Sequence, residues 1–321
     1  MGEERLPEMM PVISIVVLTY NHEEYIRKCI DSILAQKTTF PYEIVIADDC
    51  STDRTVEIVR EFYSDKIKLI TREKNVGICR NIYEAYREIK GKYIFDCSGD
   101  DYLPSDMALQ KHVDYLETHE DVFSVGSWIL FVDSQKGVEK VLDMPYTTYT
   151  LLDFLRGVPV GFFLGAMRNE FRQDNVEYLC KVRDAEEFQM LYYCLTKGKK
   201  AILQEPLYAY CRRTNANNYN STHSFADILK NYAQGLRAIE STDRGKHNFN
   251  VIKTISYAKP IDYMLQNEGV KSIVTILRIL TFKETCIFVW IKLLMKLNHR
   301  EMPEYLLKEE KLIKQGMKTL K

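Results

Sequence analysis

The sequence predicts an α/β protein with a mainly parallel central sheet, flanking helices and a C-terminal helical region. First, residues 12–131 alternate between short β-rich runs and longer segments with helical spacing. Second, helices of this length between strands favour right-handed βαβ units with parallel strands. Third, residues 225–321 contain helical patterns alone. This order of elements predicts a Rossmann-like sheet followed by a helical part.

Five strands are expected in the first part of the chain. VISIVVLT (12–19) is a continuous β-rich run, which is typical of a strand buried on both faces of a parallel sheet. The other expected strands are YEIVIADD (42–49), IKLITRE (67–73), KYIFDC (92–97) and DVFSVGSWILFVD (121–133).

Helices are expected between these strands. In EEYIRKCIDSILAQ (23–36) the apolar residues recur at helical spacing. In STDRTVEIVREFY (51–63), Ser51 and Thr52 occupy capping positions at the start of the helix. The other expected helices are ICRNIYEAYREIK (78–90) and SDMALQKHVDYLE (105–117).

From residue 134 to residue 224 the pattern is less regular. The expected elements are a turn at 133–137, a short helix in TLLDFLRG (150–157), a strand at GFFLGAMR (161–168) and a helix at DAEEFQMLYYCLTKG (184–198). TNANNYNST (214–222) is a polar loop of the kind that often covers an active site.

The composition argues against several classes of protein. The chain of 321 residues has a formal net charge of −1, so no global field recruits nucleic acid. Its eight Cys form no CxxC pair, which disfavours zinc sites and redox motifs. The first residues, MGEERLPEMM, lack the basic and apolar regions of a signal peptide. We therefore expect free thiols in the reducing cytoplasm.

The segment 272–297 is apolar, but charged residues interrupt it at Arg278, Lys283, Glu284, Lys292 and Lys296. Its charge-free stretches are far shorter than the roughly 20 residues that span a bilayer. One helical stripe carries residues at sevenfold spacing, Arg278, Thr285, Lys292 and His299. Two interpretations stay open: a helix in the membrane interface, or a helix packed on the core or on a second subunit.

Polar residues directly follow three of the expected strands. They are Thr19-Tyr20-Asn21, Asp48-Asp49 and Ser98-Gly99-Asp100-Asp101. Ligands of parallel sheets bind beyond the carboxyl ends of the strands, so these residues can converge on one crevice. A carboxylate cluster there suits a hard divalent cation, Mg²⁺ or Mn²⁺, that also binds phosphate oxygens of a nucleotide.

Other side chains at this edge could contact a nucleotide. The second strand ends in IADDCSTDRT, where an aspartate could accept the imide N–H of a uracil or the hydroxyls of a ribose. REKNVGICRN supplies Arg80, which could bind a phosphate through two parallel hydrogen bonds. Taken singly, each loop also fits a helix cap or a solvated acidic turn. Their shared order at one sheet edge favours a binding site.

Four motifs resemble the family 2 inverting glycosyltransferases of the GT-A fold, of the bacterial surface-polysaccharide type. They are SIVVLTYNHEEYIRKCIDSILAQ, YEIVIADDCSTDRT, NVGICRNIYEAYREIKGKYIFDCSGDDYLP and AEEFQMLYYCLTKGKKAILQEPLYAY. The resemblance implies a GT-A domain over 1–224, with a nucleotide-sugar half at 1–133 and an acceptor half at 134–224. The helical region over 225–321 would associate with a membrane or form a homo-oligomer.

The resemblance implies roles for individual residues of this sequence. The nucleotide would be bound by Thr19, Tyr20, Asn21, Asp48, Asp49, Arg80, Ser98 and Gly99. Asp100 would contact the metal, Mn²⁺ or Mg²⁺, with Asp101 supporting it. Glu187 would be the catalytic base, with Glu186 and Asp184 as alternates.

Three features depart from the family pattern. Ser98 occupies the first position of the family's DxD motif, where an acid contacts the ribose or the metal. Glu187 stands where relatives often carry Asp, so its carboxylate is one methylene further out. A His that many relatives carry after a segment like LYAY is not matched, and the candidates to contact the diphosphate instead are Arg212, Arg213 and His223.

The resemblance implies inverting transfer of a sugar from a nucleoside diphosphate sugar, with UDP as the expected carrier, to a hydroxyl of a glycan or lipid-linked acceptor. The expected role is synthesis of bacterial capsule, lipopolysaccharide or exopolysaccharide by a cytoplasmic enzyme, peripheral on the cytoplasmic face of the membrane. A nucleotidyltransferase and a non-catalytic module for sugar nucleotides or glycans are the alternatives. The first usually needs a Gly-rich basic loop, which is missing after VVLT. A dehydrogenase is disfavoured because no GxGxxG opens the first helix.

Overall fold

The structure, a computed structural model, describes residues 10–62, 65–144, 146–156, 165–171, 174, 177–180, 183, 186–212, 224–243 and 245–250, and parts of 252–285. Contacts divide the chain into two compact units. The first comprises 1–150 and 161–222, and the second comprises 151–160 and 223–321. The segment 151–160, which the sequence interpretation placed in the acceptor half, is thus grouped with the helical unit.

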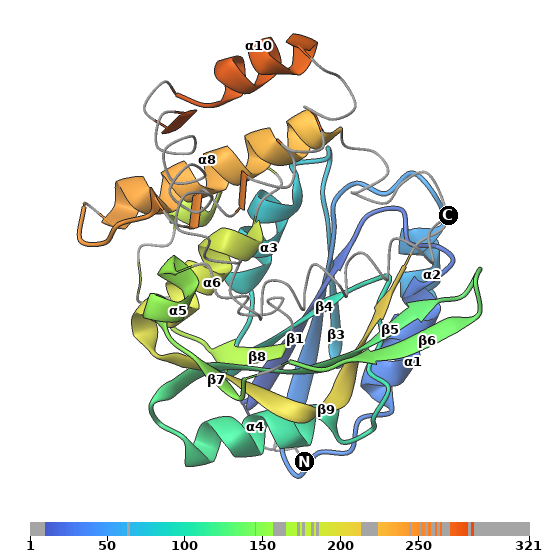
Figure 1. The fold of residues 1–321 in the computed structure, drawn as a ribbon. Helices are drawn as coiled ribbons and strands as arrows, with labels where there is room; N and C mark the ends of the chain where they lie inside the picture. Colours follow the sequence, from blue (N-terminus) through green and yellow to red (C-terminus); the bar gives the residue numbers. More distant parts are fainter. Residues whose placement is uncertain are drawn as a thin grey trace, which may run out of the picture. The chain divides into compact units, whose positions relative to one another are not determined.

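A sheet forms the centre of the first unit, with the strand order β3-β2-β1-β4-β8-β5-β9-β7 and β6 beside β5 (Figure 1). Its strands are β1 (Ile13–Thr19), β2 (Tyr42–Asp48), β3 (Ile67–Thr71), β4 (Tyr93–Ser98), β5 (Val122–Asp133), β6 (Val138–Leu142), β7 (Thr148–Tyr149), β8 (Gly165–Arg168) and β9 (Lys199–Cys211). All five strands expected in the first part of the chain are present, as β1 to β5. The predicted α/β fold with a mainly parallel sheet is confirmed.

Most strands share one direction. β1 pairs in parallel with β2 and β4, and β2 pairs in parallel with β3. β8 lies antiparallel between β4 and β5, and β9 is parallel to β5. Two reversals return β5 and β9 to the direction of β1, so the carboxyl ends of these strands meet at one edge. β6 returns along β5 through the turn at 134–137, as an antiparallel hairpin.

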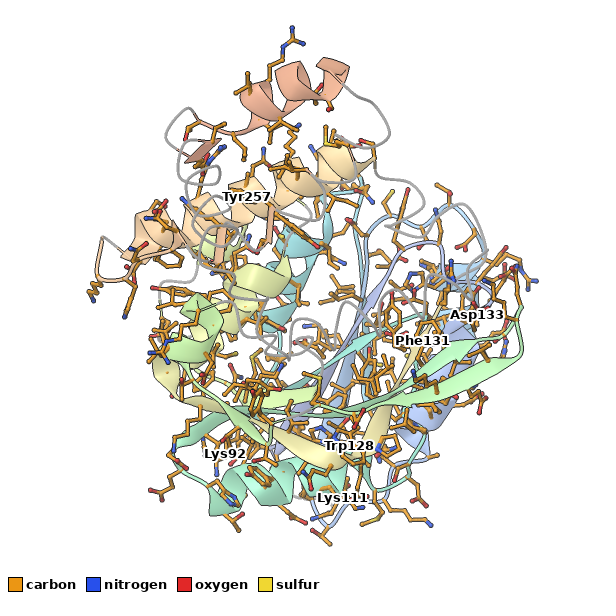
Figure 2. The ribbon with its side chains drawn as sticks, in the orientation of Figure 1. Lys92, Lys111, Trp128, Phe131, Asp133 and Tyr257 are labelled. Carbon is orange, nitrogen blue, oxygen red and sulfur yellow. The ribbon has the colours of Figure 1, made fainter. Side chains whose placement is uncertain are left out.

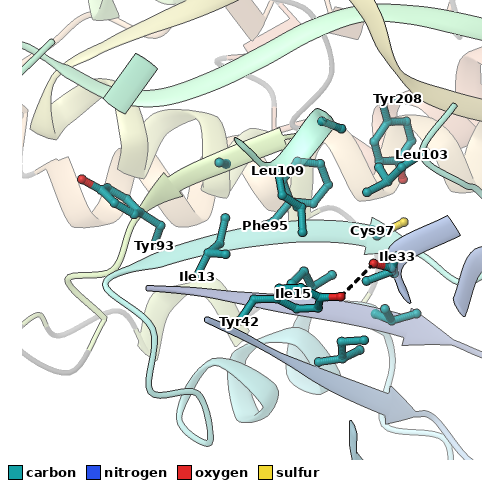
Figure 3. Close-up of a cluster of buried hydrophobic side chains, with 14 of the residues drawn as sticks. Ile13, Ile15, Ile33, Tyr42, Tyr93, Phe95, Cys97, Leu103, Leu109 and Tyr208 are labelled. Carbon is teal, nitrogen blue, oxygen red and sulfur yellow. Dashed lines mark hydrogen bonds between the residues drawn. The ribbon is translucent and has the colours of Figure 1, made fainter. Parts of the chain in front are cut away.

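Helices cover both faces of the sheet in the first unit (Figure 1). They are α1 (Ile26–Leu34), α2 (Thr55–Glu61), α3 (Ile78–Tyr86), α4 (Ala108–Thr118), the 3₁₀ helix η1 (Glu177–Cys180) and α6 (Glu186–Lys197). On one face, odd-numbered residues of β1 share a buried cluster with apolar side chains of α1 and α4 (Figure 3). On the other face, α3 packs on β1 and β2. β1 and β2 are therefore buried on both sides, as their apolar runs predict.

The second unit consists of the helices α5 (Leu151–Leu155), α8 (Phe225–Asp243) and α10 (Val270–Ile279), with shorter helical pieces. Arg237 of α8 donates to the Ile279 carbonyl at 2.8 Å and pairs with Glu284. Tyr257, labelled in Figure 2, lies 3.5 Å from Glu284 through its hydroxyl. No helix among the described residues is long and apolar enough to cross a membrane. The single helical stripe expected at 278–299 is wrong in its described part: α10 ends at Ile279, and residues 284–285 belong to a separate helical piece, so Arg278 and Thr285 do not share one helix. Lys292 and His299 lie outside the described residues.

Candidate functional site

Hydrogen bonds join the loops that follow β1 and β2. The Asp49 amide donates to the Thr19 carbonyl at 2.9 Å, and the Asn21 amide donates to Ser51 Oγ at 2.9 Å. The Thr52 amide donates in turn to Asn21 Oδ1 at 2.8 Å. Asn21 has a φ of 55°, a left-handed conformation that Asn adopts more readily than most residues. The two loops therefore form one continuous edge.

The expectation that Ser51 and Thr52 cap the next helix is wrong. α2 begins at Thr55, and Asp53 Oδ1 accepts the Thr55 amide at 2.9 Å. Ser51 instead donates its amide to Asp48 Oδ2 at 2.8 Å and its hydroxyl to the same carboxylate. The side chains of Ser51 and Thr52 form hydrogen bonds with the loop after β1 or within the turn after β2, so they do not cap α2.

Three predicted nucleotide-binding residues at this edge differ in exposure. Asp48 is 1% exposed, and its carboxylate closes the turn through Ser51. Tyr20 is 42% exposed. Thr19 is 2% exposed, and its hydroxyl has no hydrogen-bond partner among the described residues. A buried hydroxyl at a strand end that lacks a protein partner is a group that a ligand or a water satisfies.

Asp49 holds the loop that leads into α3. Its carboxylate accepts the Val76 amide at 2.7 Å and the Gly77 amide at 2.9 Å. Burial raises the pKa of Asp49, and these two hydrogen bonds together with the charges of Arg183 and Arg72 reduce the rise. Arg183 also accepts the Cys79 amide through its carbonyl at 3.1 Å. Sequence reasoning did not single out Arg183, because its partners lie in a distant loop.

Arg80 lies on the exposed side of α3. Its guanidinium donates to Glu84 one turn further along, and this partner raises the pKa of Arg80. Glu84 also pairs with Arg72 at 2.8 Å, and Arg72 Nε donates to Asn81 Oδ1 at 3.0 Å. Arg80 is thus part of a surface cluster of charges near the loop that Asp49 holds.

The acidic loop after β4 packs against the loop after β1. The Gly99 amide donates to the Leu18 carbonyl at 2.7 Å, and a Cβ at Gly99 would lie 2.7 Å from His22 Nδ1. Asp100 Oδ1 accepts the Ser98 hydroxyl at 2.5 Å and lies 3.9 Å from His22 Nδ1. The side chain of Asp100 is 18% exposed, so it reaches the surface of the site. His22 belongs to this site, although the sequence prediction omitted it.

The neighbouring Asp101 has different surroundings. It is 3% exposed, and its Oδ2 accepts the Tyr208 hydroxyl at 2.8 Å. Its Oδ1 accepts the Cys211 amide at 2.8 Å. The two adjacent carboxylates therefore have separate partners, with Asp101 held by β9 and Asp100 close to His22.

The side chains at the acidic loop fit a divalent cation that is shared with a phosphate ligand. Among the described residues, no group of three or more His, Cys, Asp or Glu side chains is arranged to hold a metal ion. Asp100 and Ser98 supply one carboxylate and one hydroxyl, which are hard oxygen donors. Mg²⁺ and similar ions in nucleotide sites often take only one or two protein carboxylates, with phosphate and water oxygens completing the shell.

Arg212 lies just beyond the carboxyl end of β9. Its amide donates to the Val132 carbonyl at 2.8 Å, and its guanidinium lies 3.4 Å from Asp133 Oδ2. Figure 2 labels Asp133 near the end of β5, with Phe131 beside it. The other two diphosphate candidates, Arg213 and His223, lie outside the described residues.

The position of the predicted catalytic base is described only in part. α6 begins at Glu186 and contains Glu187, but the side chains of both residues and all of Asp184 lie outside the described part of the chain. A carboxylate in the first turn of a helix is stabilised by the helix dipole. The assignment of Glu187, with its alternates, stays a prediction.

Residues 14–177 of the 321 match the model of glycosyl transferase family 2. The chain belongs to this family. The matched residues include β1 from its second residue, all of β2 and β4, and the loops that follow these three strands. The family expected from the four motifs is therefore confirmed.

Curated relatives match part of this chain. Uncharacterized protein Rv1520 of Mycobacterium tuberculosis is 41% identical over 112 residues, 34% of this chain and 32% of the relative. The putative glycosyltransferase EpsE of Bacillus subtilis is 34% identical over 126 residues, 38% of this chain and 45% of the relative. The putative teichuronic acid biosynthesis glycosyltransferase TuaG of the same species is 26% identical over 153 residues, which are 47% of this chain and 60% of the relative. The chain thus spans about a third of the length of the first relatives it matches.

Solved structures confirm the GT-A fold. TarS from S. aureus, in complex with UDP, has a TM-score of 0.57 at 20% identity and covers 79% of this chain and 72% of that chain. The mannosyltransferase PcManGT from Pyrobaculum calidifontis, in complex with GDP-Man and Mn²⁺, has a TM-score of 0.51 at 15% identity. This match covers 98% of this chain and 88% of PcManGT. At these identities the likeness shows the fold alone.

Proposed function

We propose that this glycosyltransferase moves a sugar, with inversion at the anomeric carbon, from a nucleoside diphosphate sugar to a hydroxyl of a glycan or lipid-linked acceptor. UDP is the expected nucleotide. Proteins of the same fold bind UDP or GDP-Man, which supports a donor of this chemical class. The name of TuaG, a relative in teichuronic acid biosynthesis, supports a role in bacterial surface polysaccharide synthesis, such as capsule, lipopolysaccharide or exopolysaccharide.

The observation that carries the proposal is the meeting of three polar loops at one sheet edge. Strand register places Thr19 beside Asp48 and Leu18 beside Ser98. The residues that follow these positions therefore start from adjacent strands, and hydrogen bonds join their loops. A crevice of this kind at the carboxyl ends of parallel strands is where nucleotides bind in α/β sheets.

In this proposal Thr19, Tyr20 and Asn21 border the nucleoside, while Asp48 and Asp49 shape the two loops that face it. Asp100, with the Ser98 hydroxyl, would hold Mn²⁺ or Mg²⁺. Such an ion, when bound, neutralises negative charge on the leaving diphosphate. Further positive charge near the diphosphate would come from Arg80, Arg212, Arg213 and His223.

Glu187 would act as the general base. It would take the proton from the acceptor hydroxyl while that oxygen attacks the anomeric carbon on the face opposite the diphosphate. The base has to be ionised before the reaction, and its place in the first turn of α6 favours the carboxylate. Glu186 and Asp184 are the alternates, since they lie in or beside the same turn.

A panel of nucleotide sugars tests the proposal directly. Thermal stabilisation of the full chain, measured with each sugar in the presence and absence of Mn²⁺, should single out the donor. Transfer from that donor should give a product with inverted anomeric configuration by proton NMR. A retained configuration, or a panel without any stabilising nucleotide sugar, would contradict the proposal.

Glu187→Gln separates transfer from binding. The variant should bind the donor like the unaltered protein and transfer at least about a hundredfold more slowly, because general base catalysis contributes factors of this size. Glu88→Gln, at an exposed residue paired with Lys68, is the matched control and should keep its activity. Full activity of Glu187→Gln, with loss in Glu186→Gln or Asp184→Asn, would move the role of base to that residue.

The location at the cytoplasmic face of a membrane is also part of the proposal. A lipid-linked acceptor is reached at such a surface, and the apolar segment 272–297 with its interspersed basic residues suits the membrane interface. The full chain should co-sediment with anionic vesicles, while a chain ending at residue 270 should stay in the supernatant. Equal partition of the two would contradict it, and light scattering of both shows whether the same region forms a homo-oligomer.

A further inference from the structure

We propose that Tyr208 is a positioning residue: through Asp101 and Ser98 it fixes the acidic loop, residues 98–102, and so sets the place of the Asp100 carboxylate. The inference rests on the proposed function, in which Asp100 contacts a divalent cation. It also gives Asp101 a role different from the metal contact predicted from the sequence.

The Tyr208 hydroxyl bridges the two ends of the acidic loop. It accepts the Ser98 amide at 3.0 Å and donates to Asp101 Oδ2 at 2.8 Å. Tyr208 is 1% exposed and Asp101 is 3% exposed, so water does not replace these bonds easily. Figure 3 shows the Tyr208 ring beside Cys97 and Leu103, the residues on either side of the loop.

Backbone hydrogen bonds extend the same connection. The Cys211 amide donates to Asp101 Oδ1 at 2.8 Å. The Tyr102 amide donates to the Ala209 carbonyl at 3.3 Å, and the Ala209 amide donates to the Tyr102 carbonyl at 2.9 Å. The last residues of β9, just before Arg212, thus hold the acidic loop through hydrogen bonds to its side chains and to its backbone.

Both oxygens of Asp101 accept hydrogen bonds from β9, whereas Asp100 lies close to Ser98 and His22. Loss of the hydroxyl would leave a buried carboxylate oxygen and a partly buried amide without this partner. The loop would then adopt the arrangement that presents Asp100 for a smaller fraction of the time. The affinity for the cation would fall in proportion to that fraction.

Tyr208→Phe tests this inference, with Tyr93→Phe as the matched control. Tyr93 is also a fully buried tyrosine, but it lies at the first residue of β4, whereas the acidic loop begins at the last. Without metal, amide exchange of peptides covering 98–102 should be about tenfold faster in Tyr208→Phe and unchanged in Tyr93→Phe. By titration calorimetry, Mn²⁺-dependent binding of UDP should weaken about tenfold in Tyr208→Phe alone.

Asp101→Asn provides a second measurement. A positioning role predicts faster exchange of the loop, as in Tyr208→Phe. A metal-ligand role predicts normal exchange with weakened Mn²⁺ binding, and that result would overturn the inference, as would unchanged exchange and binding in Tyr208→Phe. If the unaltered protein binds neither UDP nor GDP with Mn²⁺, the proposed function fails, and the exchange measurement still decides the restraint by Tyr208.

Discussion

The carboxylate of Asp49 accepts the backbone amide of Gly77 at 2.9 Å, so a buried acid at the end of β2 fixes the loop before α3. Gly77 has a φ of 87°, which side chains rarely tolerate. A Cβ there would lie 2.5 Å from Arg183 Cγ and 3.0 Å from the Arg183 carbonyl oxygen. The loop therefore needs glycine for its backbone conformation and for the space that Arg183 occupies.

Gly77→Ala should lower the free energy of unfolding by about 2–3 kcal/mol, since positive φ costs about 1 kcal/mol and the contact with Arg183 adds to it. Urea denaturation measures the loss. Gly137→Ala is the matched control, because Gly137 also has a positive φ, 61°, but no atom lies within 4 Å of its Cβ position. Equal losses in the two variants would show that the Arg183 contact has no effect.

Asp96 should make the protein less stable as the pH rises from about 4 to about 7. It is buried on β4, its Oδ1 has no hydrogen-bond partner among the described residues, and burial raises its pKa to about 7, opposed by the Tyr86 hydroxyl. Above the unfolded-state pKa of 3.8, the folded protein keeps a proton on Asp96 that the unfolded chain has lost. Stability therefore falls from about pH 4 to about pH 7 and is level above that.

Asp96→Asn should therefore be more stable than the unaltered protein at pH 8, by at most about 4 kcal/mol, with the difference vanishing near pH 4. Asn keeps an oxygen to accept the Tyr86 hydroxyl. Urea denaturation at several pH values gives the profile, and the exposed Asp31→Asn should leave it unchanged. Parallel profiles for Asp96→Asn and the unaltered protein would contradict the assigned pKa.

The strands β1 to β5 could be predicted because each is a compact β-rich run between polar turns, and burial on both faces leaves a local signal. The contacts between loops could not be predicted from the sequence. Ser51 has the residue type and position of a helix cap, yet it bonds to Asn21, 30 positions away. Such a partner depends on the register of β1 and β2, which the local sequence does not contain.

The same limit explains the acidic loop. Three aspartates in DCSGDDYLP indicated a site, but Asp100 and Asp101 look equivalent in the sequence. They differ because Tyr208, 107 positions beyond Asp101, reaches one of them. Family resemblance supplied the class of reaction, whereas the partners of each carboxylate required the folded chain.

Glu284 should stabilise the second unit strongly. Its side chain is 7% exposed, it pairs with Arg237, and Lys253 lies 3.5 Å away. The pKa of Glu284 falls to about 2, because hydrogen bonds from Arg237 and Thr281 outweigh burial. A lowered pKa means that this contribution is present above the unfolded value of 4.5 and is lost as the pH falls toward 2.

Glu284→Gln should cost about 3 kcal/mol at pH 7, because it leaves partly buried cations without their charge partner. Thermal or urea unfolding at pH 7 measures the loss. The control is Glu61→Gln, which breaks an exposed pair with Arg27, whose side chain is 51% exposed, and should cost less than about 1 kcal/mol. Similar costs would show that Glu284 behaves as a surface acid.

Asp100→Asn should abolish the effect of Mn²⁺ on nucleotide binding while leaving the fold intact. Asp100 is the carboxylate of the acidic loop that reaches the surface, and even partners outside a metal's first shell change affinity 10-fold or more, so the loss should be at least about tenfold. Calorimetric titration with UDP or GDP, with Mn²⁺ or with EDTA, separates the metal-dependent part. Asp106→Asn, at an exposed acid paired with Lys37 at 2.6 Å, is the control and should bind normally. If Asp100→Asn keeps the full effect of Mn²⁺ on nucleotide binding, the cation lies elsewhere. If the nucleotide affinities of Asp100→Asn and the unaltered protein are equal only in EDTA, Asp100 carries the metal contact.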